Sequence, residues 1–232
     1  MRSFELYLDE SGKFINEDNA ITPSLIGGIL VKKDDLSIEK AQDIMDEAIK
    51  NVSGNYVHIN DISKIDLKLS GKISTEIMQQ IKKIPSYVVI FSNKELLDFK
   101  DDKLLYLNIM AEGIINLLEK LSIEKADPIE LNIIAAVRRD LHIDDDKTII
   151  EIEEYSTRIR ERIYMKMAEK NLFLSKNCKV NFKLSSARKN AKLMLADVVC
   201  NSKLTLNSNK FNSEQRNVLN SIFDSSKYIF SV

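Results

Sequence analysis

The sequence contains no tryptophan, and its seven tyrosines and nine phenylalanines are scattered along the chain. No aromatic platform on which the bases of a single strand could stack is therefore visible. Only three prolines and six glycines occur among 232 residues, and no stretch has the composition of a linker, a low-complexity tail or an internal repeat. We therefore predict one domain that spans residues 1–232.

The chain also lacks the apolar run of about 18 residues that a membrane-spanning helix needs, and no basic and apolar leader opens it. We expect a cytoplasmic protein that makes no contact with a membrane. Two cysteines, Cys178 and Cys200, are too few for a disulfide framework, and neither lies in a CxxC motif. Both are expected to be reduced, half-buried thiols.

Charge is balanced overall but unevenly distributed. The net charge is -1, yet residues 155–216 contain 14 Lys and Arg against 4 Asp and Glu. A basic block of this size can attract a polyanion such as nucleic acid. The alternative is that these lysines and arginines lie on solvated helix faces. The block gains meaning if it lies near candidate catalytic carboxylates.

The alternation and periodicity of apolar residues predict a mixed α/β fold. A hairpin of antiparallel strands opens the sheet, parallel strands follow, and helices flank both faces. Gly27 and Gly28, inside the second strand, predict a bulge or a close approach of another backbone. The lysines of the strand at 178–184 predict an edge position. Strands are predicted at 4–12, 25–31, 87–91, 129–137 and 178–184, and helices at 37–51, 68–83, 104–121, 148–170 and 191–206.

The first strand ends in two adjacent acids, a hydroxyl and a glycine. Phe4, Leu6 and Leu8 alternate with polar residues, and Asp9, Glu10 and Ser11 follow. A carboxylate at the end of a central strand is costly unless a positive group lies beside it, and a divalent cation is the simplest such group. The alternative is that Asp9 and Ser11 only shape a turn.

Asp197 lies in a helix that is apolar on nearly every side, with the sequence LMLADVVC around it. A lone carboxylate in a buried helix costs several kcal/mol unless it is paired or binds a metal. Asn201 lies one turn further on and could hold the outer oxygen of this carboxylate. The alternative is a buried structural ion pair with a nearby Lys or Arg, but a metal shared with Asp9 would account for both acids.

The segments YLDESG and LMLADVV, with a histidine and a pair of arginines between them, resemble the DUF3800 family of bacterial proteins, which is itself similar to RNase H-like nucleases. The resemblance covers most of the chain, from the first strand to the last predicted helix. It implies a metal-dependent phosphodiesterase site built from carboxylates at strand ends and on one late helix. Asp9 and Asp197 match the two acids of that pattern, and His58 matches the polar position of its middle segment.

Metal-dependent phosphodiester hydrolysis needs oxygen ligands, and Asp9, Glu10 and Asp197 supply them. In a two-metal site, Mg²⁺ or Mn²⁺ ions about 4 Å apart activate water and stabilise the leaving oxygen. Positively charged and polar side chains near the acids would contact substrate phosphate. We predict that role for Ser11, Arg138, Arg139, Arg188, Lys189, Lys192 and Asn201.

The chain departs from the resemblance at the end of its fourth predicted strand. Related sequences commonly have an Asp just before the arginines, where this chain has Ala135, Ala136 and Val137. Asp140 could supply the missing ligand, or the site could bind one metal weakly. A third reading is a degenerate nuclease or a deliberate replacement of the acid by alanine.

Three functions are compatible with these patterns. The first is a Mg²⁺- or Mn²⁺-dependent nuclease that acts on DNA or RNA, in bacterial defence or in a mobile element. The second is a catalytically degenerate protein on the same scaffold, which binds nucleic acid, a partner protein or a second copy of itself. The third is a hydrolase of another phosphoester, such as a nucleotide.

Overall fold

The computed structural model describes residues 1–12, 14, 24–53, 66–92, 102–124, 127–137, 146–172, 177–187 and 190–232; the side chains of 102–104 and 146–152 are outside this description. Its elements are β1 (Arg2–Ser11), β2 (Leu25–Lys32), α1 (Ile38–Ser53), α3 (Leu67–Lys83), β3 (Ser86–Ser92), α4 (Asp102–Glu124), β4 (Ile129–Ala136), α5 (Asp146–Glu169), β5 (Cys178–Ser185), α7 (Ala191–Leu204), α8 (Ser213–Asp224) and β6 (Tyr228–Ser231).

Six of these elements form one sheet in the order β5-β4-β1-β2-β3-β6. β2 is antiparallel to both β1 and β3, whereas β1, β4 and β5 are parallel to one another and β3 is parallel to β6. The predicted fold class is therefore confirmed, as are the opening hairpin and the edge position of β5. β1 lies in the interior of the sheet, which places its carboxyl end beside that of β4.

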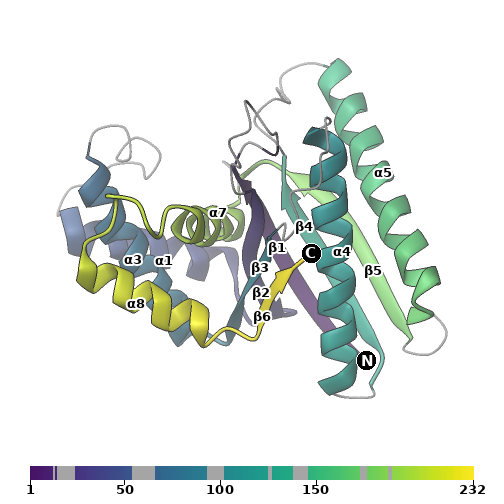
Figure 1. The fold of residues 1–232 in the computed structure, drawn as a ribbon, viewed down its shortest axis with the longest axis horizontal. Helices are drawn as coiled ribbons and strands as arrows, with labels where there is room; N and C mark the ends of the chain where they lie inside the picture. Colours follow the sequence, from purple (N-terminus) through teal and green to yellow (C-terminus); the bar gives the residue numbers. More distant parts are fainter. Residues whose placement is uncertain are drawn as a thin grey trace.

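The helices form two layers, one on each face of the sheet (Figure 1). α4 and α5 pack on the face that contains Leu6 and Leu8, and α1, α3, α7 and α8 pack on the face that contains Tyr7. Successive side chains of a strand point to opposite faces. Asp9 and Ser11 therefore share the face of Tyr7, which is the face covered by α7.

Gly27 and Gly28 allow α7 to lie close against β1 and β2. A Cβ atom on Gly27 would be 3.4 Å from Cα of Cys200, and one on Gly28 would be 3.1 Å from Cβ of Ala196 and 1.8 Å from the backbone oxygen of Tyr7. The close backbone approach predicted from these glycines is confirmed. It brings the middle of α7 next to the end of β1.

The sequence after Asn207 predicts a polar tail that ends in a weak helix or strand, and the structure contains both a helix and a strand there. α8 and the short edge strand β6 follow α7, so the helix at 191–206 and the strand at 178–184 are not the last elements. α8 begins with a capping box, in which Asn212 and Gln215 each accept a hydrogen bond from the other's backbone. This Asn-x-x-Gln spacing is a signal that the sequence contained.

The two cysteines are free thiols, as predicted, but both are buried rather than half-buried. Within the residues that the structure describes, no helix is both long enough and apolar enough to cross a membrane.

Candidate active site

The acids at the end of β1 lie where α7 crosses the sheet. Asp9 pairs with Gly27 of β2, and that glycine is the one that faces Cys200. Asp9 is half-buried, and its Oδ1 accepts a hydrogen bond of 2.8 Å from the backbone N–H of Glu10. Side-chain alternation along β1 turns Glu10 toward the opposite face. Of the two neighbouring acids, Asp9 is therefore the one directed toward α7.

Asn201 links the end of β1 to Asp197. Its Oδ1 accepts a hydrogen bond of 3.0 Å from the Ser11 hydroxyl, and its Nδ2 donates to Asp197 Oδ1 at 2.5 Å. Ser11 and Asn201 are 190 positions apart in the sequence. Both ends of the Asn201 amide are used, which fixes the orientation of the amide and ties Asp197 to the segment that carries Asp9.

The thiol of Cys200 shows that the acids share one region. Its Sγ lies 3.3 Å from the backbone oxygen of Asp9 and 3.5 Å from that of Leu25. Burial raises the pKa of this thiol well above its usual value, and the negative charges of Asp9, Asp197 and Glu10 raise it further. Cys200 is consequently a protonated packing residue, and Asp9, Asp197 and Glu10 all lie close enough to influence it.

Asp197 is less buried than its sequence context predicted. Its neighbours Ala196 and Val198 are almost fully buried, whereas Asp197 is half-buried. The helix therefore packs on three sides and leaves the carboxylate at the boundary between core and solvent. A carboxylate in this position keeps its charge at lower cost than one in the core and remains accessible to a cation.

Ala136 occupies the position on β4 beside Asp9. The register pairs Leu8 with Ala135, so the next position on β4 lies next to Asp9. Ala136 shares the face of Ile134, which packs with the α7 layer, and its exposed fraction is 2%. The position at which the resemblance to the DUF3800 family predicts an acid is thus directed to the same region as Asp9 but carries only a methyl group.

Lys192 makes contacts that favour a structural role. Its Nζ lies 3.2 Å from Glu5 Oε2 and 3.0 Å from the Tyr7 hydroxyl, and that hydroxyl donates to the same Glu5 oxygen at 2.8 Å. Burial, followed by the hydrogen bond and charge of Glu5, raises the pKa of Tyr7 strongly. The predicted contact of Lys192 with substrate phosphate stays a prediction.

The described residues of the basic block at 155–216 are divided between the two helix layers. α5 packs in one helix layer and α7 in the other (Figure 1). Acids outside the block also neutralise part of its charge: Lys166 pairs with Glu112 at 2.7 Å, and Lys179 pairs with Glu130 at 2.9 Å. The hypothesis of a single phosphate track across the whole block is therefore wrong, because the fold divides the block between two faces.

Several predicted site residues lie outside the described part of the chain, and their roles stay predictions. These residues are His58, Arg138, Arg139, Asp140, Arg188 and Lys189.

The donor set around Asp9 and Asp197 suits a hard divalent cation only in part. Among the described residues, no group of three or more His, Cys, Asp or Glu side chains is arranged to hold a metal ion. Mg²⁺, however, is often bound by one or two carboxylates together with water and substrate phosphate. Asp9 and Asp197 are half-buried oxygen donors, and both influence the Cys200 thiol, which fits a site of this open type.

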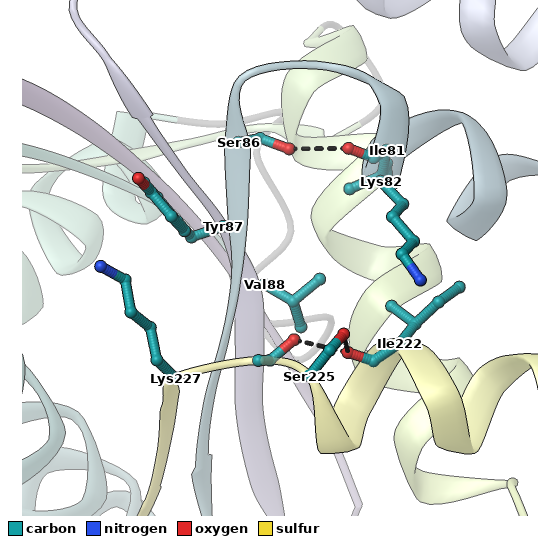
Figure 2. A pocket seen from close by; sticks show the side chains of 9 residues that line it. Ile81, Lys82, Ser86, Tyr87, Val88, Ile222, Ser225 and Lys227 are labelled. Carbon is teal, nitrogen blue, oxygen red and sulfur yellow. Dashed lines mark hydrogen bonds between the residues drawn. The ribbon is translucent and has the colours of Figure 1, made fainter.

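A cavity of about 160 Å³ lies elsewhere, where α3 and α8 end beside the start of β3. Figure 2 shows Val88 at its centre, with Lys82 and Ile222 on one side and Tyr87 and Lys227 on the other. Its hydroxyl groups donate to backbone oxygens: Ser86 to that of Ile81, and Ser225 and Ser226 to that of Ile222. The serine hydroxyls of this cavity thus already donate to backbone oxygens, and its lining residues include no carboxylate.

Sequence analysis missed one charged residue near Asp197. Lys210, in the segment between α7 and α8, has an exposed fraction of 9%. Burial lowers the pKa of its ammonium, and the charge of Asp197 opposes that effect. The surrounding sequence, TLNSNKFN, has the composition of a solvated turn. No local pattern distinguishes Lys210 from a surface lysine.

Comparisons with known proteins leave the family open. No protein family matches the sequence, and no curated protein is similar to it. Among solved structures, a chain of the PCNA:RNase HII complex from Archaeoglobus fulgidus matches with a TM-score of 0.43 and 13% identity, over 97% of this chain and 90% of that chain. At these values the match carries no argument about function, so the site itself has to support one.

Proposed function

We propose that this protein is a divalent-metal-dependent nuclease or phosphodiesterase that acts on DNA or RNA. The carrying observation is the convergence of Asp9 and Asp197 on one region, with Asn201 joining their segments through Ser11. Clustered carboxylates repel one another and gain from a shared cation. The resemblance of YLDESG and LMLADVV to the DUF3800 family and to RNase H-like nucleases supports the same proposal.

In this proposal Asp9 and Asp197 hold Mg²⁺ or Mn²⁺, with Glu10, Asp140 and His58 as further candidates. The bound ion would supply an activated water and would stabilise the leaving oxygen of a phosphodiester. The protein's own part is positional. Asn201 orients Asp197 through a hydrogen bond to its Oδ1, and the backbone N–H of Glu10 orients Asp9 through a hydrogen bond to its Oδ1.

The test pairs metal binding with cleavage. We expect Mn²⁺ to bind the wild-type protein in a calorimetric titration, and labelled DNA or RNA to be cleaved in Mn²⁺ but not in EDTA. Asp197→Asn and Asp9→Asn should each lower cleavage by at least about a hundredfold, because a ligand supplies several kcal/mol of stabilisation. Asp224→Asn, an exposed acid on α8, is the matched control. A protein that binds no Mn²⁺ would contradict the proposal.

The second candidate is a non-catalytic protein that binds nucleic acid or another protein through the same scaffold. Ala136 favours it, because a methyl group lies beside Asp9 where a third ligand could contribute. In that case nucleic acid would bind without being cleaved under any metal condition. Cleavage that is present in the wild type and absent from Asp197→Asn would eliminate this candidate.

A further inference from the structure

β5 forms one edge of the sheet, and strand alternation shows which of its backbone groups point outward. On the inner side, the backbone oxygen of Ser185 accepts a hydrogen bond of 3.0 Å from Val137, which follows β4. Along a strand, the N–H and C=O of one residue point to one side and those of the next residue to the other. The odd-numbered residues of β5 therefore bond to β4, and the even-numbered residues, 178–184, direct their backbone groups away from the sheet.

Few of these outward groups have a protein partner. The backbone oxygen of Val180 accepts a hydrogen bond of 2.9 Å from the Tyr164 hydroxyl of α5, which leaves its second lone pair for another donor. In the described contacts, the outward N–H and C=O groups of Phe182 and Leu184 have no protein partner. β5 is eight residues long, whereas β6 at the opposite edge has four. β5 is thus the longer template for an added strand.

A shallow groove lies at the same edge. It has a volume of about 450 Å³ and is lined by Tyr164 of α5 and by residues 178–181 of β5. Tyr164 is 40% exposed, although most of its side chain is an apolar ring. A strand added at this edge would therefore bury part of that ring in addition to bonding the outward backbone groups.

On the face of β5 that α5 does not cover, one side-chain donor and one acceptor are unused. Lys179 pairs with Glu130 at 2.9 Å. The Asn181 Nδ2 donates to Asn132 Oδ1 at 2.8 Å, and no described group donates to Asn181 Oδ1. Likewise, no described carboxylate lies within ion-pair distance of Lys183. β5 thus presents a free donor and a free acceptor two positions apart, both on exposed side chains.

We propose that β5 pairs antiparallel with β5 of a second copy of this chain, about a twofold axis at Phe182. The outward groups of residues 180, 182 and 184 then bond to those of residues 184, 182 and 180 of the partner subunit. On the face covered by α5, the two Phe182 side chains lie opposite each other, and each Val180 lies opposite Leu184 of the partner subunit. This interface does not depend on the proposed nuclease activity.

The polar face of β5 favours this register and this occupant. With the axis at Phe182, the Lys183 donor lies opposite the acceptor of Asn181 of the partner subunit, and symmetry makes this contact twice. With the axis one residue earlier, Lys179 would lie opposite Lys183 of the partner subunit at two places, and like charges in direct opposition destabilise a sheet. A second copy thus complements both the backbone and the side chains of β5.

Amide hydrogen exchange of the wild type, followed by NMR at about 5 and about 500 µM, tests the interface directly. The outward N–H groups of Val180, Phe182 and Leu184 should exchange at least about tenfold more slowly at the higher concentration, because the second strand accepts their hydrogen bonds. The N–H groups of Asn181 and Lys183 face β4 and should not change. Sedimentation equilibrium over the same range should show the mass doubling.

Two variants test the register by the dissociation constant of the dimer. Asn181→Lys should raise this constant about tenfold, because it removes the acceptor and places a lysine opposite Lys183 of the partner subunit at both symmetric positions. Adding Lys183→Glu to that variant should restore the constant to within about threefold of the wild type, since each new lysine then faces a carboxylate. Asn220→Lys, the same change at an exposed asparagine of α8, is the matched control and should change it less than about twofold.

Three results would overturn the proposal. The first is a wild type that stays monomeric at about 500 µM. The second is a dimer in which protection does not alternate along β5, because such a dimer would use another surface. The third is a monomer whose outward amides become protected only when a peptide of alternating valine and glutamate is added, which would assign the edge to a different protein. The exchange measurement uses the wild type, so it decides the question even if Asn181→Lys does not fold.

Discussion

The beginning and the middle of α7 both lie beside β1, but the charged groups in these two regions have different surroundings. At the beginning of the helix, Lys192, Glu5 and Tyr7 satisfy one another through three hydrogen bonds. At its middle, Asp197 is joined through Asn201 to the segment that carries Asp9, and no described carboxylate lies within ion-pair distance of Lys210. In the first region, the charges of Lys192 and Glu5 balance and their hydrogen bonds are satisfied, as expected of a structural contact. The second contains two carboxylates whose segments are joined through Asn201, and it is the region on which the proposed function rests.

The largest expected effect comes from disturbing the packing of β2 against β1, beneath the middle of α7. Gly28→Ala would place a methyl group 1.8 Å from the backbone oxygen of Tyr7, so we expect the free energy of unfolding to fall by more than about 3 kcal/mol. Urea denaturation measures this. Gly27→Ala is the control, because its closest contact is the terminal carbon of Ile90, which can rotate away; an equal loss in both variants would contradict the explanation.

Removing the hydrogen bonds among Lys192, Glu5 and Tyr7 should also reduce stability. Lys192→Met leaves Glu5 and the Tyr7 hydroxyl without their cation in a largely buried place, at a cost of about 2 kcal/mol. Lys210→Met should instead be close to neutral, since it removes a buried charge that has no direct partner. Urea midpoints of the two variants, compared at neutral pH, decide the matter. Equal destabilisation by both would mean that the two lysines are structurally equivalent.

The proposed metal site can be tested by adding a carboxylate beside Asp9. Ala136→Asp should lower stability without metal by about 2 kcal/mol, because Ala136 is buried and the new acid faces like charge. Mn²⁺ should restore the loss and bind more tightly than to the wild type. Thermal unfolding with and without Mn²⁺ tests this expectation, with Ala136→Asn as the uncharged control. A variant that gains nothing from Mn²⁺ would argue against a metal at this end of β1.

The link between the two acidic segments makes a smaller contribution. Asn201→Ala removes the acceptor of the Ser11 hydroxyl and the donor to Asp197, and should lower stability by about 1 kcal/mol. Because Asn201 orients a proposed ligand, Mn²⁺ affinity should also fall by about tenfold. Calorimetry measures the affinity. Thr205→Val, which removes the hydroxyl that donates to the backbone oxygen of Asn201, tests whether any change on this face has the same effect.

The last prediction concerns Tyr7, whose raised pKa should make stability depend on pH only in the alkaline range. The pKa of Tyr7 is raised in the folded protein, so the folded state keeps its proton above pH 10 while the unfolded state loses it. Stability should therefore be unaffected below about pH 10 and should fall above it, by at most about 1.4 kcal/mol per pH unit. Urea unfolding from pH 9 to about 11 measures the slope. Tyr7→Phe should flatten that slope, and an unchanged slope would show that other groups control it.

The sequence could predict that Asp9 and Asp197 lie in one region, because each acid differs from the apolar pattern of its neighbours. Asp9 follows an alternating strand and Asp197 interrupts an apolar helix, so both acids could be singled out from their neighbours. The glycines at 27 and 28 likewise predicted the close approach of α7. Lys210 could not be found in this way, because its burial depends on contact with Gly71, far away in the sequence, and its own segment is polar.

The division of the basic block between two helix layers shows what a charge count along the sequence could not predict. The count of charged residues along the sequence combined α5 and α7 into one region. In the fold, β5 lies between them in the chain, and the two helices pack on opposite faces of the sheet. Pairing of Lys166 with Glu112 and of Lys192 with Glu5 then joins residues that lie far apart along the chain. A charge count over consecutive residues contains no information about such partners, so it predicted a surface that the fold does not form.

The position of β1 inside the sheet has a consequence for how the chain folds as it is synthesised. Residues 2–8 pair with residues 129–135 of β4, and Ser11 can donate its hydrogen bond only after Asn201 has been synthesised. For most of translation, the acidic end of the first strand has one neighbour at most and no helix above it. The proposed site would thus be assembled among the last steps of synthesis, so that a chain stalled before α7 would contain Asp9 and Glu10 but not Asp197.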